Sequence, residues 1–308
     1  NSSAFNNLGR LYFNGQGVKK NYSKAKNCYE FSANLKNPYA FNNLGYLYEN
    51  GYGVEQDYSK AKEYYELGIK YKDVRALYNL GYLYEKGHGV DQNYTKAKEY
   101  YELAADHKDA KALNKLGNLY YDGKGVKQDY IKAKEYYEMS ANLNNIESIN
   151  NLGYLYFTGK GVNKDYLKAK EFFEKSAKYN NLKAIKTLGI IYEKGFGVKK
   201  DFLLAKQYYE LAVKYNDPES INKLGNLYYY GLGVEQNYSK AKEYYELGAK
   251  NKNPISLYIL GCMYEKGIGV EQNYLKAKDY YELSSQSKNP EAFLRIGNLY
   301  RKGRGVQK

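Results

Sequence analysis

The chain has 308 residues, with 48 Lys and Arg against 34 Asp and Glu, which gives a formal net charge of +14. Hydrophobic residues make up 43% and charged residues 27%, which excludes a disordered chain, and no apolar run approaches the ~20 residues of a membrane-spanning helix. Two Cys and two His exclude a disulfide framework and a zinc site that recurs along the chain.

The dominant feature of the sequence is a repeat with a period of 36 residues. Three patterns recur in phase: Leu-Gly or Ile-Gly, then Gly-x-Gly-Val, then Lys-Ala-Lys-x-Tyr-Tyr-Glu. The glycine of the first pattern recurs without insertion at Gly9, Gly45, Gly81, Gly117, Gly153, Gly189, Gly225, Gly261 and Gly297. Residues 1–308 are therefore predicted to form a single array of eight full repeats and the first helix of a ninth.

Each repeat begins with a predicted amphipathic helix, described here for the second repeat. Asn37 can cap this helix, since its side chain can accept a hydrogen bond from a first-turn amide, and Pro38 fits the first helical position. Apolar residues then follow at the helical spacing i, i+4, i+7 and i+8, namely Ala40, Leu44, Leu47 and Tyr48. Gly51 can end the helix in a left-handed conformation.

A second predicted helix completes the repeat. It begins after Asp57, and Ala61 and Tyr65 lie on one of its faces. A glycine in the middle of a helix costs about 1 kcal/mol relative to alanine, so Gly45 of the first helix needs a packing reason. We expect that a β-carbon at Gly45 would push the second helix away.

Two short helices cannot bury their apolar stripes alone, but stacked copies can bury them against one another. The sequence therefore predicts an all-α fold, a right-handed α/α superhelical solenoid of 36-residue helix–turn–helix repeats.

The pattern Ala-x-x-x-Leu-Gly-x-x-Tyr-x-x-Gly-x-Gly-Val-x-x-Asp-Tyr-x-Lys-Ala, from Ala40 to Ala61, resembles the SEL-one-like repeat, a relative of the tetratricopeptide repeat. The resemblance covers essentially the whole chain. It implies a protein-binding adaptor in assembly, signalling or quality-control complexes. After the second helix this chain has Lys or Asn where the family often has Gly, so the turn is expected to differ in shape. Secreted members with a disulfide in each repeat are not matched, because only Cys28 and Cys262 are present.

The candidate partner-binding residues are the variable ones on the first helix, which the resemblance places on the concave surface. An Asn amide can both donate and accept hydrogen bonds, so a ladder of Asn could hold an extended peptide backbone, and interleaved Tyr adds contact area. The expected stripe consists of Asn42, Tyr46, Tyr78, Tyr82, Asn114, Asn118, Asn150, Tyr154, Asn222 and Asn226. The alternative is a solvated polar groove that binds nothing.

Other function classes find less support in the sequence. The net charge makes a basic solenoid that binds RNA or single-stranded DNA the alternative function, but many Lys alternate with Glu on the second helix and no nucleic-acid motif is present. The Gly-x-Gly pattern follows a helix rather than a strand, which indicates turns and not phosphate loops. No catalytic constellation is visible, so we predict a chain that is not an enzyme and needs no cofactor or metal.

The ends of the sequence and its cysteine content give two further expectations. The low cysteine content favours an intracellular, reducing setting. No second helix follows Phe293, Ile296 and Tyr300, although terminal repeats usually need a cap. We therefore expect either a longer protein or docking of the C-terminal end on further repeats or another chain.

Overall fold

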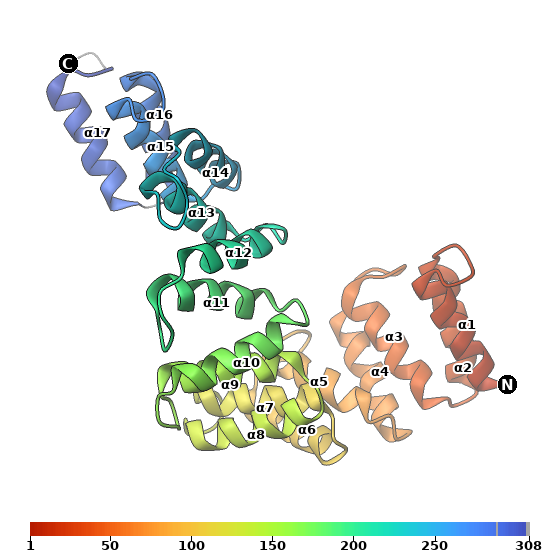
Figure 1. Cartoon of the computed structure of the whole chain (residues 1–308). Helices are drawn as coiled ribbons and strands as arrows, with labels where there is room; N and C mark the ends of the chain where they lie inside the picture. The colour runs from red at the N-terminus through yellow and green to blue at the C-terminus, as the bar shows by residue number, and fades with distance from the viewer. Residues whose placement is uncertain (288, 306–308) are drawn as a thin grey trace. The chain divides into compact units, whose positions relative to one another are not determined.

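The computed structural model describes residues 1–287 and 289–305, and this described part contains seventeen α-helices and no strand (Figure 1). The first helices of the repeats are α1 (Ser2–Asn14), α3 (Pro38–Asn50), α5 (Arg75–Lys86), α7 (Ala110–Asp122), α9 (Ile146–Thr158), α11 (Leu182–Lys194), α13 (Pro218–Tyr230), α15 (Pro254–Lys266) and α17 (Pro290–Lys302). The second helices are α2 (Tyr22–Asn34), α4 (Tyr58–Lys70), α6 (Tyr94–Asp106), α8 (Tyr130–Asn142), α10 (Tyr166–Ala177), α12 (Phe202–Val213), α14 (Tyr238–Lys250) and α16 (Tyr274–Gln286). The prediction of paired helices in every full repeat is confirmed.

The helices form two compact units, Asn1–Lys164 and Asp165–Lys308. Within each unit, every helix packs against the helices before and after it. Side-chain hydrogen bonds also join consecutive first helices, such as α3 to α5 through Asn42 and Asn79. Each unit therefore has a layer of first helices and a layer of second helices with the core between them. That all 308 residues form one array stays a prediction, which rests on the unbroken period.

The predicted capping residues begin the helices. The side chain of Asn37 accepts a hydrogen bond from the backbone amide of Tyr39, and that of Asp57 accepts one from Lys60. Helix α5 differs, because it begins at Arg75, one residue later than its equivalents. Asp73 nevertheless accepts a hydrogen bond from the Arg75 amide at 3.1 Å, so the acidic residue still satisfies the first turn.

The packing reason for the mid-helix glycine is confirmed. A β-carbon built on Gly45 would lie 2.6 Å from a ring carbon of Tyr65, which is fully buried in the second helix of the same repeat. The same overlap with the equivalent tyrosine occurs at Gly9, Gly81, Gly117, Gly189, Gly225 and Gly261. At Gly297 the β-carbon would meet no described atom within 4 Å. The glycine is therefore needed where a second helix packs against it.

The turn after the second helix keeps one shape despite its variable residue. Lys72 and Asn144 both have positive φ angles, 69° and 61°, and the equivalent residues share this left-handed conformation. The expectation that this turn differs in shape is therefore wrong. The conformation costs Lys more than Gly, because the lysine β-carbon crowds the following carbonyl.

The Gly-x-Gly segments are turns between the two helices of one repeat, and they pack against the preceding repeat. Both glycines have positive φ, and a β-carbon on Gly53 would lie 2.6 Å from that of Tyr22 in the preceding repeat. The side chain between the two glycines packs on the same tyrosine, since the rings of Tyr22 and Tyr52 stack with centroids 4.9 Å apart. His88 stacks on Tyr58 in the equivalent way. The pattern therefore serves packing between repeats.

Candidate partner-binding face

Part of the predicted stripe lies inside the protein. Asn42, Asn150 and Asn222 are only 8%, 1% and 6% exposed. The prediction that this helix position is exposed is wrong, because the position faces a neighbouring first helix. Asn79 donates to the Oδ1 atom of Asn42 at 2.8 Å, and Asn222 donates to Asn253 at 3.4 Å.

Hydrogen bonds of several first-helix asparagines hold successive repeats together, although the buried Asn150 side chain has no hydrogen-bond partner among the described residues. Asn114 accepts hydrogen bonds from Asn151 at 3.1 Å and from Ser148 at 2.8 Å. Asn43 donates to Asn6 in the same way, at 2.8 Å. The first unit therefore has separate Asn–Asn hydrogen bonds between repeats, and the predicted ladder of amides that holds a peptide backbone stays a prediction.

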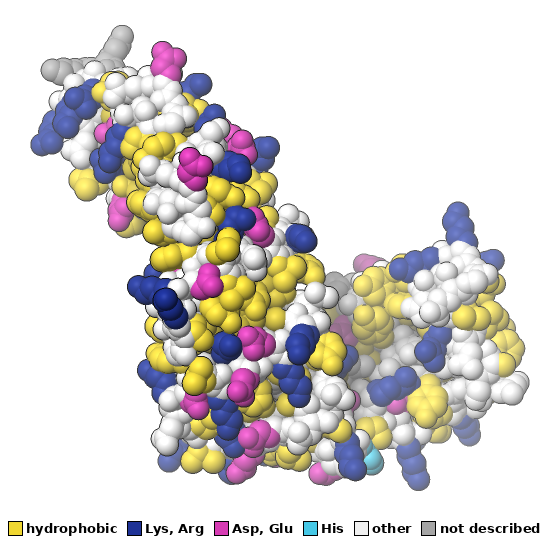
Figure 2. Space-filling model, in the orientation of Figure 1, with side chains coloured by type: hydrophobic (Ala, Val, Ile, Leu, Met, Phe, Trp, Pro, Cys, Tyr) yellow, Lys and Arg dark blue, Asp and Glu magenta, His cyan; other side chains and the backbone are white. Residues whose placement is uncertain are grey.

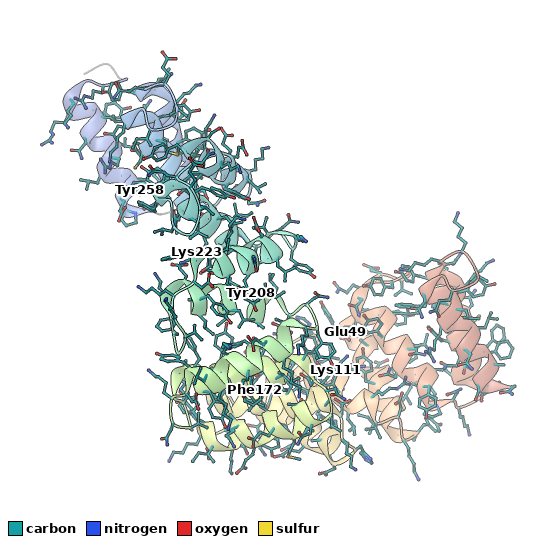
Figure 3. All side chains as sticks on the ribbon, in the orientation of Figure 1. Glu49, Lys111, Phe172, Tyr208, Lys223 and Tyr258 are labelled. Atoms are coloured by element: carbon teal, nitrogen blue, oxygen red, sulfur yellow. The ribbon has the colours of Figure 1, made fainter. Side chains whose placement is uncertain are left out.

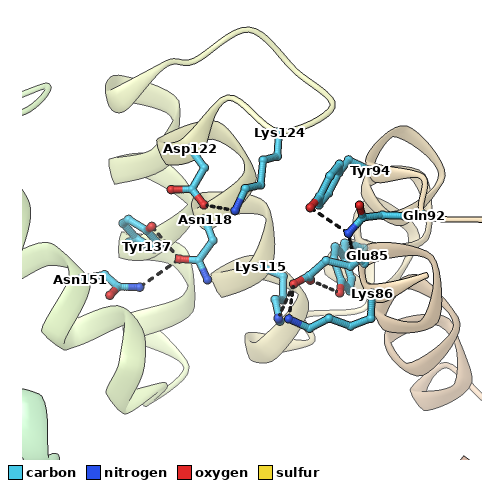
Figure 4. Close-up of polar contacts among 11 residues, drawn as sticks. Glu85, Lys86, Gln92, Tyr94, Lys115, Asn118, Asp122, Lys124, Tyr137 and Asn151 are labelled. Carbon is cyan, nitrogen blue, oxygen red and sulfur yellow. Dashed lines mark hydrogen bonds and ion pairs between the residues drawn. The ribbon is translucent and has the colours of Figure 1, made fainter. Parts of the chain in front are cut away.

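Asn118 and Asn226 meet a buried hydroxyl group in their own repeat. Tyr137 donates to Asn118 at 2.8 Å (Figure 4), and Tyr245 donates to Asn226 at 2.7 Å. In other repeats the equivalent tyrosine donates to a glutamate three residues further along the first helix. These pairs are Tyr65–Glu49, Tyr101–Glu85, Tyr209–Glu193 and Tyr281–Glu265. Burial makes such a partner necessary, and Phe173, which has no hydroxyl, occupies this position in the fifth repeat.

A cation replaces the asparagine donor in several repeats. Lys115 lies 3.0 Å from the Glu85 carboxylate of the preceding repeat (Figure 4), and Lys223 lies 3.0 Å from Glu193. Arg295 approaches Glu265 at 3.7 Å. The contact between successive first helices therefore has two forms, an Asn–Asn hydrogen bond and a Lys/Arg–Glu ion pair.

Two equivalent glutamates, Glu49 and Glu193, have opposite pKa shifts. Burial opposes ionisation of Glu193, but hydrogen bonds from Tyr209, Lys194 and Lys223 hold its pKa below the ordinary value. Burial raises the pKa of Glu49, and the hydrogen bond from Tyr65 offsets this only in part. Two cations distinguish the sites: Lys194 and Lys223 contact Glu193, whereas Asn50 and Asn79 stand at the equivalent positions around Glu49.

The predicted tyrosines lie closer to solvent. Tyr46 is exposed, whereas Tyr78, Tyr82 and Tyr154 are half-buried. Burial raises the pKa of Tyr78 to about 12, so its hydroxyl stays protonated at neutral pH. Of the predicted residues, Tyr46 is the one most open to a partner.

The residues that the first helices present to solvent follow the spacing i, i+4, i+7 and i+11. In the second repeat these are Tyr39, Asn43, Tyr46 and Asn50, and we call these positions in all repeats the first-helix face. The predicted stripe was displaced by one residue at Asn42. The helical spacing from the buried Ala40, Leu44 and Leu47 indicates that Tyr39 and Asn43, rather than Asn42, face away from the core.

Cations lie against tyrosine rings on this face of the first unit and on the adjacent Tyr78, which stands at the Asn42 position. The guanidinium carbon of Arg75 lies 4.5 Å from the ring centroid of Tyr39. The ammonium of Lys111, a residue labelled in Figure 3, lies 5.9 Å from the ring centroid of Tyr78. Lys86 and Lys115 lie 5.6 Å and 5.1 Å from the ring of Tyr82. We call Tyr39, Arg75, Tyr78, Tyr82, Lys86 and Lys111 the cationic–aromatic patch.

Hollows in the surface lie elsewhere. One of about 330 Å³ is lined by residues of α6, α7 and α8, including Glu102, Tyr120 and Tyr136. Another of about 430 Å³ lies near the ends of α4 and α6 and includes Ile69 and Leu103. Among residues 1–287 and 289–305, no cluster of three His, Cys, Asp or Glu could hold a metal ion. In the same part of the chain, every helix is too short or too polar to cross a bilayer.

The comparisons with known proteins agree with the repeat and the fold. The Sel1 repeat model matches residues 2–37, 38–70, 74–109, 110–145, 146–180, 184–214, 218–253 and 254–289. A comparison with curated protein sequences finds no significant match.

Solved structures provide three similar proteins. The chain is 29% identical to c5321, a protective antigen of uropathogenic Escherichia coli with an SLR fold, with a TM-score of 0.81 over 98% of this chain. It spans 65% of that protein, which is less than two thirds of its length. A Sel1 repeat protein from Oxalobacter formigenes is 29% identical, with a TM-score of 0.71 over 82% of this chain and 100% of its own. Yeast Tom70, at 14% identity and a TM-score of 0.54 over 98% of this chain and 65% of its own, shares the fold alone.

The family assignment rests on agreement between the sequence pattern and the structure. The matched segments cover most of the chain, and each contains the helix pair described above. Repeat solenoids of this kind are generally scaffolds for protein interaction. The chain belongs to the Sel1 repeat family.

Proposed function

We propose that this chain is a non-enzymatic scaffold that binds a partner protein or an extended peptide along the first-helix face. The observation that carries the proposal is that some polar positions of the first helix join repeats while its aromatic positions face solvent. Asn42 and Asn43 bond to neighbouring repeats, whereas Tyr39 and Tyr46 are exposed large aromatic side chains. Exposed aromatic residues on a rigid helix layer provide binding area at low entropic cost.

The proposed contact residues differ from the predicted stripe. Asn42, Asn150 and Asn222 are buried and therefore support the scaffold rather than contact a partner. Tyr46, Tyr82 and Tyr154 stay in the proposed face. Asn43, Asn79 and Asn151 belong to the same face but are half-buried and donate hydrogen bonds to the preceding repeat, so they too support the scaffold. Asn114, Asn118 and Asn226 are half-buried and position tyrosine or asparagine side chains.

Nucleic-acid binding is the less favoured function because the positive charge is dispersed. Each full repeat has a Lys–Glu pair at i, i+4 on its second helix, such as Lys62–Glu66 at 2.7 Å. Around α8 in Figure 2, Lys and Arg side chains lie interspersed with Asp and Glu. Such a mixed surface lacks the continuous basic strip that follows a phosphate backbone.

Affinity capture with two matched variants tests the proposal. Y46A/Y82A removes aromatic area from the first-helix face, and L103A/M139A removes exposed apolar area from the second helices. We expect proteins captured from an extract of the expressing cells, identified by mass spectrometry, to be lost with the first variant and kept with the second. Equal capture by both variants, or capture abolished by nuclease, would contradict the proposal.

A further inference from the structure

We propose that the cationic–aromatic patch binds an acidic partner segment that also carries apolar or aromatic side chains. This inference rests on the proposed function and adds the chemistry of the partner. The patch lies on α3, α5 and α7, all within the first unit, so no part of it depends on how the two units are placed.

The charges of the patch are arranged with the cations outward. The Asp73 side chain is 1% exposed and accepts two hydrogen bonds from the Arg75 guanidinium, whose side chain is 49% exposed. Glu85 is likewise mostly buried, where it accepts a hydrogen bond from Tyr101 and pairs with Lys115. Asp73 therefore holds the Arg75 guanidinium in place while that guanidinium stays half exposed to solvent, and Lys115 and Glu85 are both mostly buried.

Lys86 and Lys111 are the cations most open to an added carboxylate. Lys111 is exposed and has no carboxylate partner among the described residues. Lys86 is exposed and approaches Glu85 only at 3.7 Å. Neither side chain joins two repeats through a short ion pair, so either can contact a partner without loss of packing.

The tyrosine rings favour a carboxylate over a nucleobase. A cation lies against Tyr39, Tyr78 and Tyr82, and cations bind the negative face of a ring. The ring edges carry the opposite partial charge and attract anions. Bases stack on free ring faces, so the bound cations disfavour single-stranded nucleic acid and leave edges that suit acidic and apolar side chains.

The second unit lacks this arrangement at the same helix positions. Residues equivalent to Tyr39, Arg75 and Lys111 are Glu219, Ile255 and Glu291 in its last three repeats. Glu219 is about half exposed and pairs with Lys186 at 2.8 Å. The fold is the same in both units, so the difference in surface chemistry assigns the acidic segment to the first.

Two double variants with the same change in net charge test the assignment. K86E/K111E reverses charge in the patch, and K183E/K266E reverses charge at the equivalent helix positions of the second unit, where both lysines are exposed. The probe is a fluorescein-labelled peptide of twelve residues, alternating Glu with Leu or Phe. Fluorescence anisotropy gives the Kd for each protein, and circular dichroism checks that each variant is folded.

We expect the acidic peptide to bind and K86E/K111E to raise its Kd by about tenfold or more, since two exposed charge contacts are lost and made repulsive. K183E/K266E should change the Kd less than about twofold. The neutral variant K86Q/K111Q should give an intermediate Kd, which separates charge from misfolding.

Three outcomes would overturn the inference: no binding of the acidic peptide, equal weakening by both charge reversals, or tighter binding of a peptide with Lys in place of Glu. Tighter binding of a twelve-nucleotide oligo-dT probe would also overturn it, in favour of nucleic acid. If the peptide experiment fails but the Y46A/Y82A variant still loses captured proteins, the scaffold function stands and only the acidic segment is wrong. The two failures are therefore distinguishable.

Discussion

The contact between the two helices of one repeat differs from the contact between the first helices of successive repeats. Inside a repeat, a glycine faces a buried tyrosine, as Gly45 faces Tyr65, and this pair recurs almost unchanged. Between repeats, Asn79 bonds to Asn42 in one place and Lys115 pairs with Glu85 in the next. The contact inside a repeat uses one pair of residue types, and the contact between first helices uses at least two.

The difference follows from geometry. A ring packed against a helix backbone leaves no room for a β-carbon, so only glycine fits there. The contact between first helices lies at the edge of the core, where partly exposed side chains can exchange hydrogen bonds of several kinds. Surface chemistry can therefore vary along the chain without a change in the repeat.

The largest expected effect comes from filling the space inside a repeat. Gly225→Leu places a side chain where a β-carbon alone would lie 2.5 Å from the Tyr245 ring. We expect the free energy of unfolding to fall by about 3 kcal/mol, because the two helices must separate. Chemical denaturation measures it. The matched control is Gly297→Leu, whose β-carbon meets no described atom, and equal losses at both positions would refute the packing role.

A smaller effect is expected when a charged contact between repeats is removed. Lys223→Met keeps most of the apolar stem but leaves Glu193 without its partner in the next repeat. We expect a loss of about 1–2 kcal/mol at pH 7, since a half-buried carboxylate loses a charged hydrogen bond.

The loss of stability in Lys223→Met is expected to depend on pH. The folded-state pKa of Glu193 lies below its ordinary value, so its contribution to stability is present above the unfolded-state pKa of about 4.3 and is lost as pH falls through the folded-state pKa. The stability gap between the wild type and Lys223→Met should therefore narrow below about pH 4. Urea denaturation at each pH measures this difference in the free energy of unfolding. A difference that stays constant from pH 7 to pH 3 would show that the ion pair is not its cause.

A substitution in the turn between two repeats is expected to raise stability rather than lower it. Lys72 has a φ of 69°, which glycine adopts without steric cost. Lys72→Gly is expected to raise the free energy of unfolding by about 0.5–1 kcal/mol, read from the denaturation midpoint. Asn144→Gly is the control and should gain less, because Asn tolerates this conformation better than Lys. Destabilisation by Lys72→Gly would contradict strain at this turn.

The smallest net effect is expected from exchanging one form of contact for the other. N42Y/N79K gives the second and third repeats the residues Tyr78 and Lys115 that stand at the equivalent positions one repeat later. The new lysine can pair with Glu49, whose raised pKa should fall, and stability should stay within about 1 kcal/mol of the wild type. N79K alone should be less stable, because buried Asn42 loses its hydrogen bond. If the double variant is as unstable as N79K, the two forms are not interchangeable.

The sequence predicted the features that repeat. Helix pairing, the caps at Asn37 and Asp57, and the need for Gly45 follow from patterns present in every copy. The candidate site was predicted less well, because Asn42 and Asn43 are adjacent polar residues and helical spacing must be known to within one residue to tell which is buried. The pairing of Lys115 with Glu85, which are 30 residues apart, had no signal in local spacing.

By itself, the sequence determined the period, the helix boundaries and the family, since these depend on backbone conformation and local side chains that each copy restates. Only the tertiary structure decided which polar residues join neighbouring repeats and which face solvent. That outcome depends on how each helix is rotated about its own axis against its neighbour. Consecutive residues are 100° apart around the axis, so a shift of one residue moves a side chain from the interface to the surface.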